Sequence, residues 1–169
     1  MNNLKRSLNA YLNFTLCAGL CLILISCSGN STGYSDTDPG DTDSVFQDAS
    51  ITLDNVGSNA YVVTAIEGDG ASAMLNQNNS PIDLEIGKRF TFVNNGGAAS
   101  HPLDFRNSEG EKLLGQSGAD GRFDDDADVD AELNGNNITF TLTAELAEAF
   151  GLYICSFHPG MTASIRAVE

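Results

Sequence analysis

Short apolar runs separated by turn residues fill the sequence from about residue 51 onward, and they restrict the fold more than any other feature. Seven runs are rich in Val, Ile, Thr, Phe and Tyr, which favour strands: residues 60–66, 82–86, 89–95, 101–105, 137–143, 151–157 and 162–168. Several alternate with a period of two, so that Ile82, Leu84 and Ile86 share one face, as do Phe90 and Phe92. Gly, Asn and Asp separate the runs, as in VNNGGAAS.

One segment, TAELAEAF, favours a helix. Thr143 is a suitable N-cap, Glu145 lies in the first turn, and Leu146 and Phe150 are spaced four residues apart. Strands do not alternate regularly with helices anywhere in the chain. The pattern therefore predicts one all-β domain, residues 51–169, folded as an antiparallel sandwich or barrel with a single short helix.

The first 26 residues resemble a secretory signal peptide. Lys5 and Arg6 precede an apolar stretch, residues 16–25, that ends just before Cys27. The sequence LISC, residues 24–27, resembles a bacterial lipobox, in which the cysteine becomes the lipidated N-terminus of the mature protein. A transmembrane anchor is the alternative, but the apolar segment 12–25 is shorter than the roughly 20 residues that a spanning helix needs.

Residues 27–50 are rich in Ser, Thr, Asp and Gly and contain almost nothing that a core could bury. This composition predicts a lipidated, flexible, acidic tether. The lipid anchor predicts a location on a membrane outside the cytoplasm, on the periplasmic side. Ser28 at the second mature position favours the outer membrane if the protein comes from a Gram-negative bacterium.

Charge restricts the partners of the mature protein. The chain has 8 Lys and Arg against 23 Asp and Glu, and removal of Lys5 and Arg6 with the signal leaves 6 − 23 = −17. A charge of this sign repels nucleic acid and anionic lipid headgroups. We therefore expect no nucleic-acid partner, and cationic partners if the protein binds by charge.

The cysteines divide between the two parts of the chain. Cys17 and Cys21 lie in the predicted signal peptide, and Cys27 is the predicted lipidation site. Cys155 is then the single cysteine of the domain and has no partner for a disulfide. A lone thiol in an oxidising compartment is a liability unless it is protected or used.

Cys155 lies in the stretch YICSFHPGM, which places Cys, His and Met at intervals of three residues. The domain has two histidines, His158 in this stretch and His101 upstream. A thiolate and two imidazoles, with a thioether as a weak axial ligand, suit copper in both oxidation states. We therefore predict one copper ion bound by His101, Cys155, His158 and Met161.

These residues resemble the cupredoxins, the type 1 blue copper proteins of the plastocyanin and amicyanin kind. YICSFHPGM is similar to their ligand loop, and GKRFTFVNN with SHPLDF is similar to the strand and loop that carry their first histidine. The resemblance covers residues 51–169. It implies a Greek-key β-sandwich with one type 1 copper ion that transfers single electrons between redox proteins and is not an enzyme. It also implies that His158, amid Pro102, Phe157, Pro159 and Gly160, is the electron port.

Two residues depart from the family pattern. Pro102 stands where family members have an Asn whose backbone N–H helps to bind the thiolate sulfur, and proline has no N–H to donate. Phe157 stands where a proline is common, and its amide is free to donate. We predict that the Phe157 amide supplies the main hydrogen bond to the sulfur and so tunes the reduction potential.

Three other functions compete with electron transfer. A hydrolytic Cys–His pair would need a third residue to orient the histidine, and none is evident. Oxidases with several copper centres would need more than two histidines. A copper-binding or storage lipoprotein would use the same ligands, so the sequence leaves that alternative open.

An acidic run, residues 120–132, invites a calcium interpretation. Asp126, Asp128 and Asp130 match the start of an EF-hand loop, but Ala131 replaces the required Gly and Asn137 the bidentate Glu. The interpretation that we favour is a solvated loop that can steer a cationic partner.

Overall fold

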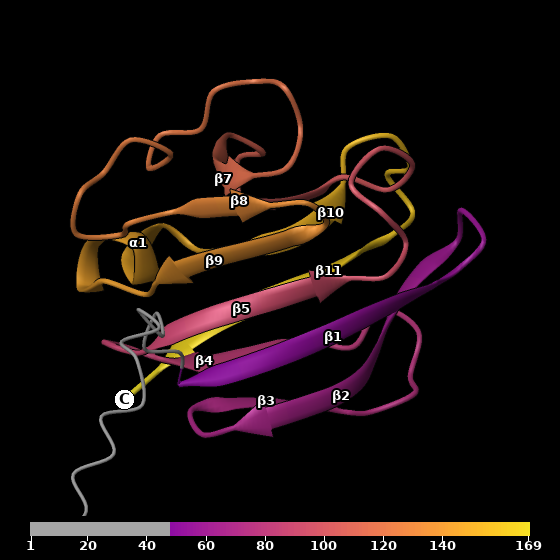
Figure 1. Ribbon diagram of the computed structural model, residues 1–169, viewed down its shortest axis with the longest axis horizontal. Coiled ribbons are helices and arrows are strands. Elements are labelled where there is room, and N and C mark those ends of the chain that lie inside the picture. The colour runs from indigo at the N-terminus through magenta and orange to yellow at the C-terminus, as the bar shows by residue number, and fades with distance from the viewer. Residues whose placement is uncertain (1–47) are drawn as a thin grey trace, which may run out of the picture. The chain divides into compact units, whose positions relative to one another are not determined.

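The computed structural model describes residues 48–169, which fold as an all-β sandwich with one short helix (Figure 1). The predicted signal peptide, Cys27 and the predicted tether up to residue 47 lie outside these residues. In chain order the strands are β1 (Ala49–Val56), β2 (Ala60–Gly68), β3 (Ala71–Ala73), β4 (Ile82–Glu85), β5 (Arg89–Asn94), β6 (Leu103–Arg106), β7 (Lys112–Gly115), β8 (Glu132–Asn134), β9 (Asn137–Thr141), β10 (Leu152–Cys155) and β11 (Thr162–Val168).

The strands form two sheets. One has the order β2-β1-β5-β9-β8 and the other the order β3-β4-β11-β10-β6-β7. Each of the seven predicted runs overlaps a strand. In the run 82–86, Ile82 and Leu84 are buried and Asp83 and Glu85 are partly exposed, but Ile86, expected on the same face, lies beyond the strand and is 37% exposed. The all-β sandwich that the sequence predicts is thus confirmed.

The expectation of purely antiparallel sheets is wrong, because both sheets are mixed. β1 runs parallel to β5, and β4 runs parallel to β11, while the other pairs are antiparallel. Side-chain alternation is the same in both kinds of pairing, so the sequence pattern could not distinguish them. β1 also begins at Ala49, slightly before the expected domain start at Ile51.

The helix α1 (Ala144–Ala149) forms where the sequence predicts it. Thr143 is the N-cap, and its side chain accepts a hydrogen bond from the Leu146 amide. Leu146 is the buried residue of the helix and anchors it to the sandwich. Among residues 48–169, no helix has the length and apolar character that crossing a membrane requires.

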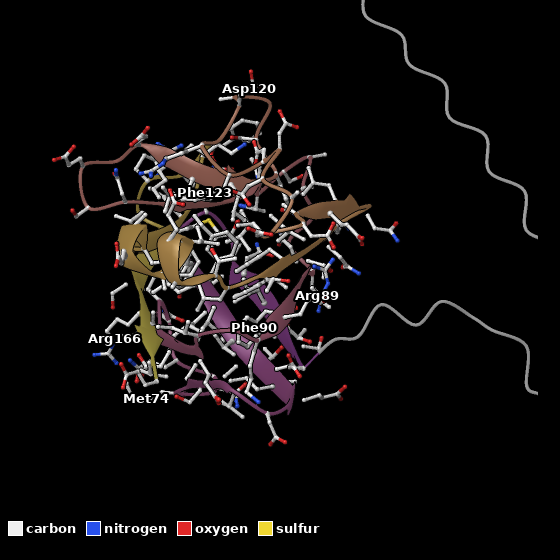
Figure 2. All side chains as sticks on the ribbon, turned by 90° about the vertical axis from the view of Figure 1, so that its left-hand side faces the viewer. Met74, Arg89, Phe90, Asp120, Phe123 and Arg166 are labelled. Carbon is white, nitrogen blue, oxygen red and sulfur yellow. The ribbon has the colours of Figure 1, made fainter. Side chains whose placement is uncertain are left out.

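Aromatic side chains fill the space between the sheets. Phe92 of β5 stacks on Phe140 of β9 with ring centroids 5.9 Å apart, and Phe105 of β6 packs edge-on against both at 4.9 and 5.1 Å. Figure 2 shows Phe90 and Phe123 among the side chains of this interior, whereas Asp120 and Met74 lie at its margin. The core therefore joins the two sheets over most of their length.

Two loops at one end of the sandwich carry the predicted metal ligands. Residues 95–102 connect β5 of one sheet to β6 of the other, and residues 156–161 connect β10 to β11 (Figure 1). Because β6 pairs with β10, the two loops emerge side by side. The fold thus brings together segments that are more than fifty residues apart in the chain.

Candidate metal centre

Three predicted ligands converge at this end of the sandwich. His101, Cys155 and His158 each offer one ligand atom, and these atoms lie within 4.8 Å of one another. Cys155 Sγ lies 3.4 Å from Nδ1 of His158 and 3.9 Å from Nδ1 of His101. Within residues 48–169 this is the one cluster of three or more His, Cys, Asp or Glu residues that could hold a metal ion.

Cys155 is placed by the last register position of β10. Its Cα partner on β6 is Leu103, and the next amide, that of Ser156, donates to Pro102 O at 3.1 Å. The ladder between β6 and β10 therefore continues to within one residue of His101. Strand pairing therefore helps to set the separation between the thiol and the loop that carries the first histidine.

Backbone hydrogen bonds close the loop that follows Cys155. The Cys155 amide donates to Met161 O at 3.0 Å, the His158 amide to Cys155 O at 3.2 Å, and the Met161 amide to His158 O at 2.9 Å. These bonds link the three ligands of YICSFHPGM to one another. The Met161 side chain is fully buried.

His101 is held through its backbone. Its amide donates to Gly97 O at 2.7 Å, and its carbonyl accepts from the Tyr61 hydroxyl at 2.6 Å and from Asn94 Nδ2 at 2.7 Å. Gly97 has φ +82°, a left-handed conformation that glycine adopts without strain, and this turn directs the chain toward His101. A buried tyrosine and a buried asparagine thus fix the position of this histidine.

The imidazole of His101 is oriented by its neighbours. The Asn55 amide lies 3.4 Å from Nε2, so that Nδ1 faces Cys155, and the ring centroid lies 4.8 Å from that of His158. Desolvation and then the charge of His158 lower the pKa of His101 below its ordinary value. The neutral imidazole, the form that binds metals, is therefore favoured.

The distances from the sulfur to the two nitrogens are close to those of a metal site. Metal–sulfur and metal–nitrogen bonds of about 2.3 and 2.0 Å, the lengths found for zinc, place S and N about 3.5 Å apart at a tetrahedral angle. The distances of 3.4 and 3.9 Å bracket that value. Two imidazoles and a thiolate form a soft donor set that could hold a metal ion.

The tyrosine beside the thiol was not recognised from the sequence. Burial, followed by the effect of the Cys155 thiol, raises the pKa of Tyr61 well above its ordinary range. Its hydroxyl therefore stays protonated and keeps donating to His101 O. Tyr61 resembles an ordinary strand residue and Asn94 resembles a turn residue of VNNGG, so no signal in the sequence marked them.

Pro102 and Phe157 differ in their surroundings. Pro102 is buried, so it does not contribute to the apolar surface that we expected around His158. Phe157 is 62% exposed, next to the exposed Pro159 and the partly exposed His158. Among the described residues no hydrogen bond joins the Phe157 amide to Cys155 Sγ, whose neighbours are the two imidazoles, so the role of this amide stays a prediction.

The acidic loop, residues 120–132, uses its carboxylates within the fold. Asp126 Oδ1 accepts from the amides of Asp128 and Val129 at 2.9 and 3.1 Å, and Asp130 pairs with Arg89 at 3.1 Å. Val129 is fully buried. The loop is therefore anchored to the core at Val129, while Asp120, Asp125 and Asp128 stay exposed, as a solvated loop predicts.

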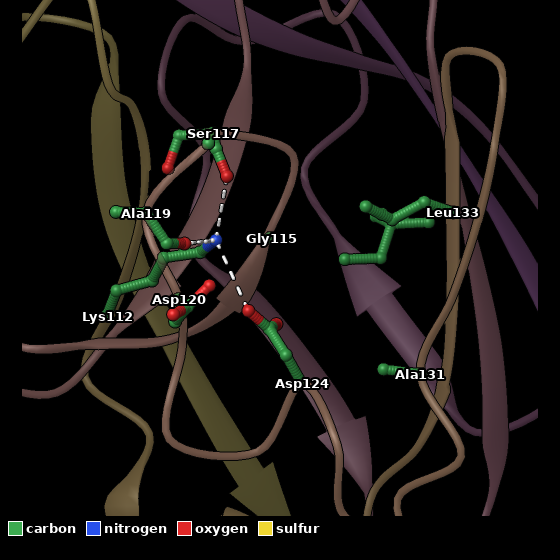
Figure 3. A pocket seen from close by; sticks show the side chains of 10 residues that line it. Lys112, Gly115, Ser117, Ala119, Asp120, Asp124, Ala131 and Leu133 are labelled. Atoms are coloured by element: carbon green, nitrogen blue, oxygen red, sulfur yellow. Dashed lines mark hydrogen bonds and ion pairs between the residues drawn. The ribbon is translucent and has the colours of Figure 1, made fainter.

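A surface cavity of about 250 Å³ lies beside this loop (Figure 3). The buried Lys112 donates to Ser117 O at 3.0 Å and to Ala119 O, and its ammonium lies 3.5 Å from Asp124 Oδ2. All three of its donors are therefore engaged by the protein itself. The Lys112 ammonium is therefore not free to bind a ligand in the cavity.

Comparison of the chain with known protein families, with curated proteins and with solved structures found no match. The class that the fold and the site define is therefore an all-β sandwich with a His–Cys–His group that can hold a metal ion.

Proposed function

We propose that this protein is a membrane-tethered type 1 copper protein of the cupredoxin kind, which transfers single electrons between redox partners outside the cytoplasm. The observation that carries the proposal is the convergence of His101, Cys155 and His158 at the end of the sandwich. In this proposal the fully buried Met161 would supply a fourth, weak thioether ligand. His2Cys sites with a weak axial Met are typical of electron-transfer copper.

Copper in such a site supplies a one-electron change between Cu(II) and Cu(I). The chain's own residues hold the ligands in place. Backbone hydrogen bonds fix the loop from Cys155 to Met161, and Tyr61 and Asn94 fix His101. Ligands that are fixed independently of the metal favour little rearrangement when the charge changes, as fast electron transfer requires.

The visible spectrum of the purified domain after addition of Cu(II) tests the metal site. We expect an intense blue thiolate-to-copper band that is absent in Cys155→Ser. Met161→Leu should shift the band, whereas Met74→Leu, at an exposed methionine, should leave it unchanged. A colourless protein in the presence of bound or excess copper would refute the proposal.

Electron transfer is distinguished from copper storage by a partner assay. The domain carries a strongly negative charge, and partly exposed His158 stands beside exposed Phe157. We propose that His158 is the electron port and that cationic, cytochrome-like proteins dock there. Stopped-flow reduction by a cationic cytochrome should slow as salt rises. Copper binding without reduction by any such partner would instead support the storage alternative.

We also propose that Cys27 carries the lipid anchor. The supporting features are the basic residues, the apolar stretch and LISC ahead of Cys27. Mass spectrometry of protein from the membrane fraction should show an N-terminal diacylglycerol cysteine, and Cys27→Ser should release the protein from that fraction. An unmodified chain that retains residues 1–26 would contradict this part of the proposal.

The Phe157 amide remains our proposed hydrogen-bond donor to the thiolate in the copper-loaded protein. Phe157→Pro, which removes the N–H, should lower the reduction potential, because a hydrogen bond to the sulfur favours the reduced metal. Phe157→Leu retains the amide and is the matched control. Equal voltammograms for the two variants would exclude this role.

A further inference from the structure

A fully buried carboxylate lies beside the ligand loop. Asp104 is on β6 between Leu103 and Phe105, and all three are completely buried. Successive side chains of a strand point to opposite faces, so Asp104 faces away from the interior that Leu103 and Phe105 help to fill. Burial of a carboxylate is costly unless it is well hydrogen-bonded. The surroundings of Asp104 therefore need an explanation.

Both carboxylate oxygens of Asp104 are satisfied. Oδ1 accepts from the Ser117 amide at 3.0 Å. Oδ2 accepts from Ser117 Oγ at 2.7 Å, from Arg106 Nη2 at 3.2 Å, and from Ser156 Oγ at short range. The backbone amide and the guanidinium can only donate, so both oxygens of Asp104 act as hydrogen-bond acceptors.

Ser156 connects this carboxylate to the metal centre. It directly follows Cys155, its amide donates to Pro102 O at 3.1 Å, and its hydroxyl donates to Asp104. Arg106 Nη2 lies 3.2 Å from the same hydroxyl. The residue after the thiol is thus attached to the segment after His101 through both its backbone and its side chain.

The neighbouring strand leaves room for the carboxylate. Gly115 of β7 is the Cα partner of Asp104, and a Cβ at this position would come within 2.5 Å of Asp104 Oδ1 and 2.7 Å of Leu103 O. Its φ of +151° also favours glycine. The Asp104 side chain therefore occupies space that a side chain at position 115 would otherwise fill.

We propose that Asp104 is a positioning residue of the metal centre. Through Ser156 it fixes the start of the ligand loop relative to His101, and its buried negative charge favours the more highly charged state of the metal. Arg106 offsets part of this charge, but its side chain is 29% exposed and more strongly screened than Asp104. The inference rests on the proposed function, because the charge can be measured only against a redox-active metal.

The electrostatic part is tested by the reduction potential of Asp104→Asn loaded with copper. Loss of the buried charge should shift the equilibrium between Cu(II) and Cu(I) about tenfold in favour of Cu(I). This shift raises the reduction potential by about 59 mV for a one-electron couple. Asp83→Asn is the matched control, since Asp83 also pairs with an arginine but lies on β4 and is more exposed. A potential that moves equally in both variants, or in neither, would overturn this part.

The positioning part is tested on the metal-free protein, so that its outcome does not depend on copper. Ser156→Ala removes the hydroxyl and keeps the charge of Asp104. We expect hydrogen exchange of the residue 156 amide to accelerate at least tenfold, with the Ile138 amide of β9 unchanged and with Ser156→Thr restoring protection. Unchanged exchange would overturn the positioning role. A protein that binds no copper, yet shows this acceleration, would refute the proposed function and leave the link between Asp104 and Ser156 standing.

Discussion

The ligand loop and the acidic loop both resemble metal-binding sequences, but the structure treats them in opposite ways. Cys155 and His158 have their ligand atoms directed at one another and at His101. The carboxylates of Asp126 and Asp130 are instead engaged by backbone amides and by Arg89. A residue can bind a metal only if the fold leaves its donor atom free of other partners. The number of potential metal ligands in a stretch of sequence therefore predicts a metal site less well than the contacts of their donor atoms.

The largest effect should come from removing a ligand from the convergent group. His158→Ala should weaken Cu(II) binding by more than about 100-fold. Removal of a residue that only hydrogen-bonds to a metal ligand can already cost up to about 100-fold, and removal of the ligand itself should cost more. Asp126→Ala should leave copper affinity unchanged. Competition titration with a chelator measures both, and equal losses in the two variants would erase the distinction between the loops.

A second prediction concerns the lysine that anchors the start of the acidic loop. Lys112→Met removes a buried ammonium and leaves Ser117 O, Ala119 O and Asp124 without this donor. The free energy of unfolding should fall by about 3 kcal/mol. Lys88→Met, at a partly exposed lysine 3.8 Å from Glu85, should cost less than about 1 kcal/mol. Urea titration compares the two, and the copper spectrum should stay unchanged in both.

A third prediction tests whether Asp126 serves the backbone or a cation. Asp126→Ala should lower the free energy of unfolding by about 1 kcal/mol, because the amides of Asp128 and Val129 lose their acceptor. The loss should be the same with calcium and with EDTA. Stabilisation of the original protein by millimolar calcium that disappears in the variant would instead show a cation site in this loop.

The smallest expected effect is a pH dependence of the metal-free protein. The pKa of His101 is lowered in the folded state by desolvation and by His158, so below about 6.5 the unfolded chain binds more protons than the folded one. Stability should therefore be fully present above about pH 6.5 and decline as the pH falls through the folded-state pKa. His101→Gln should flatten this part of the profile, and thermal unfolding between pH 5 and 7.5 measures the difference.

The sequence predicted the parts of the fold that repeat a simple pattern. β11 has the predicted bounds, and Thr143 caps α1 as expected. The strands β1, β3, β7 and β8 were missed. β7 is buried throughout and β8 is exposed throughout, so neither alternates, and β3 is only three residues long. β1 does alternate in burial, so its omission has no such reason. The parallel pairing of β1 with β5 was missed because pairing direction leaves no trace in one strand's residues.

The candidate site divides in the same way. His101, Cys155 and His158 could be selected because few residues of these types occur in the chain. The residues that hold these side chains in place, such as Asn94 and Asp104, could not be selected from the sequence. Asn and Asp are common residue types, and their roles depend on hydrogen-bond partners that only the folded structure reveals. Asn94 resembles a turn residue in VNNGG, and Asp104 resembles an exposed strand position.

The direction of the strands has a practical consequence for handling the domain. β1 runs parallel to β5, which leads into the loop of His101, and β11 runs away from the loop of His158 (Figure 1). Ala49 and Glu169 therefore lie toward the end of the sandwich opposite the two histidines. An electrode or sensor surface joined through the C-terminus would leave His158 facing the solution, so the orientation suited to interfacial electrochemistry is already present in the strand order.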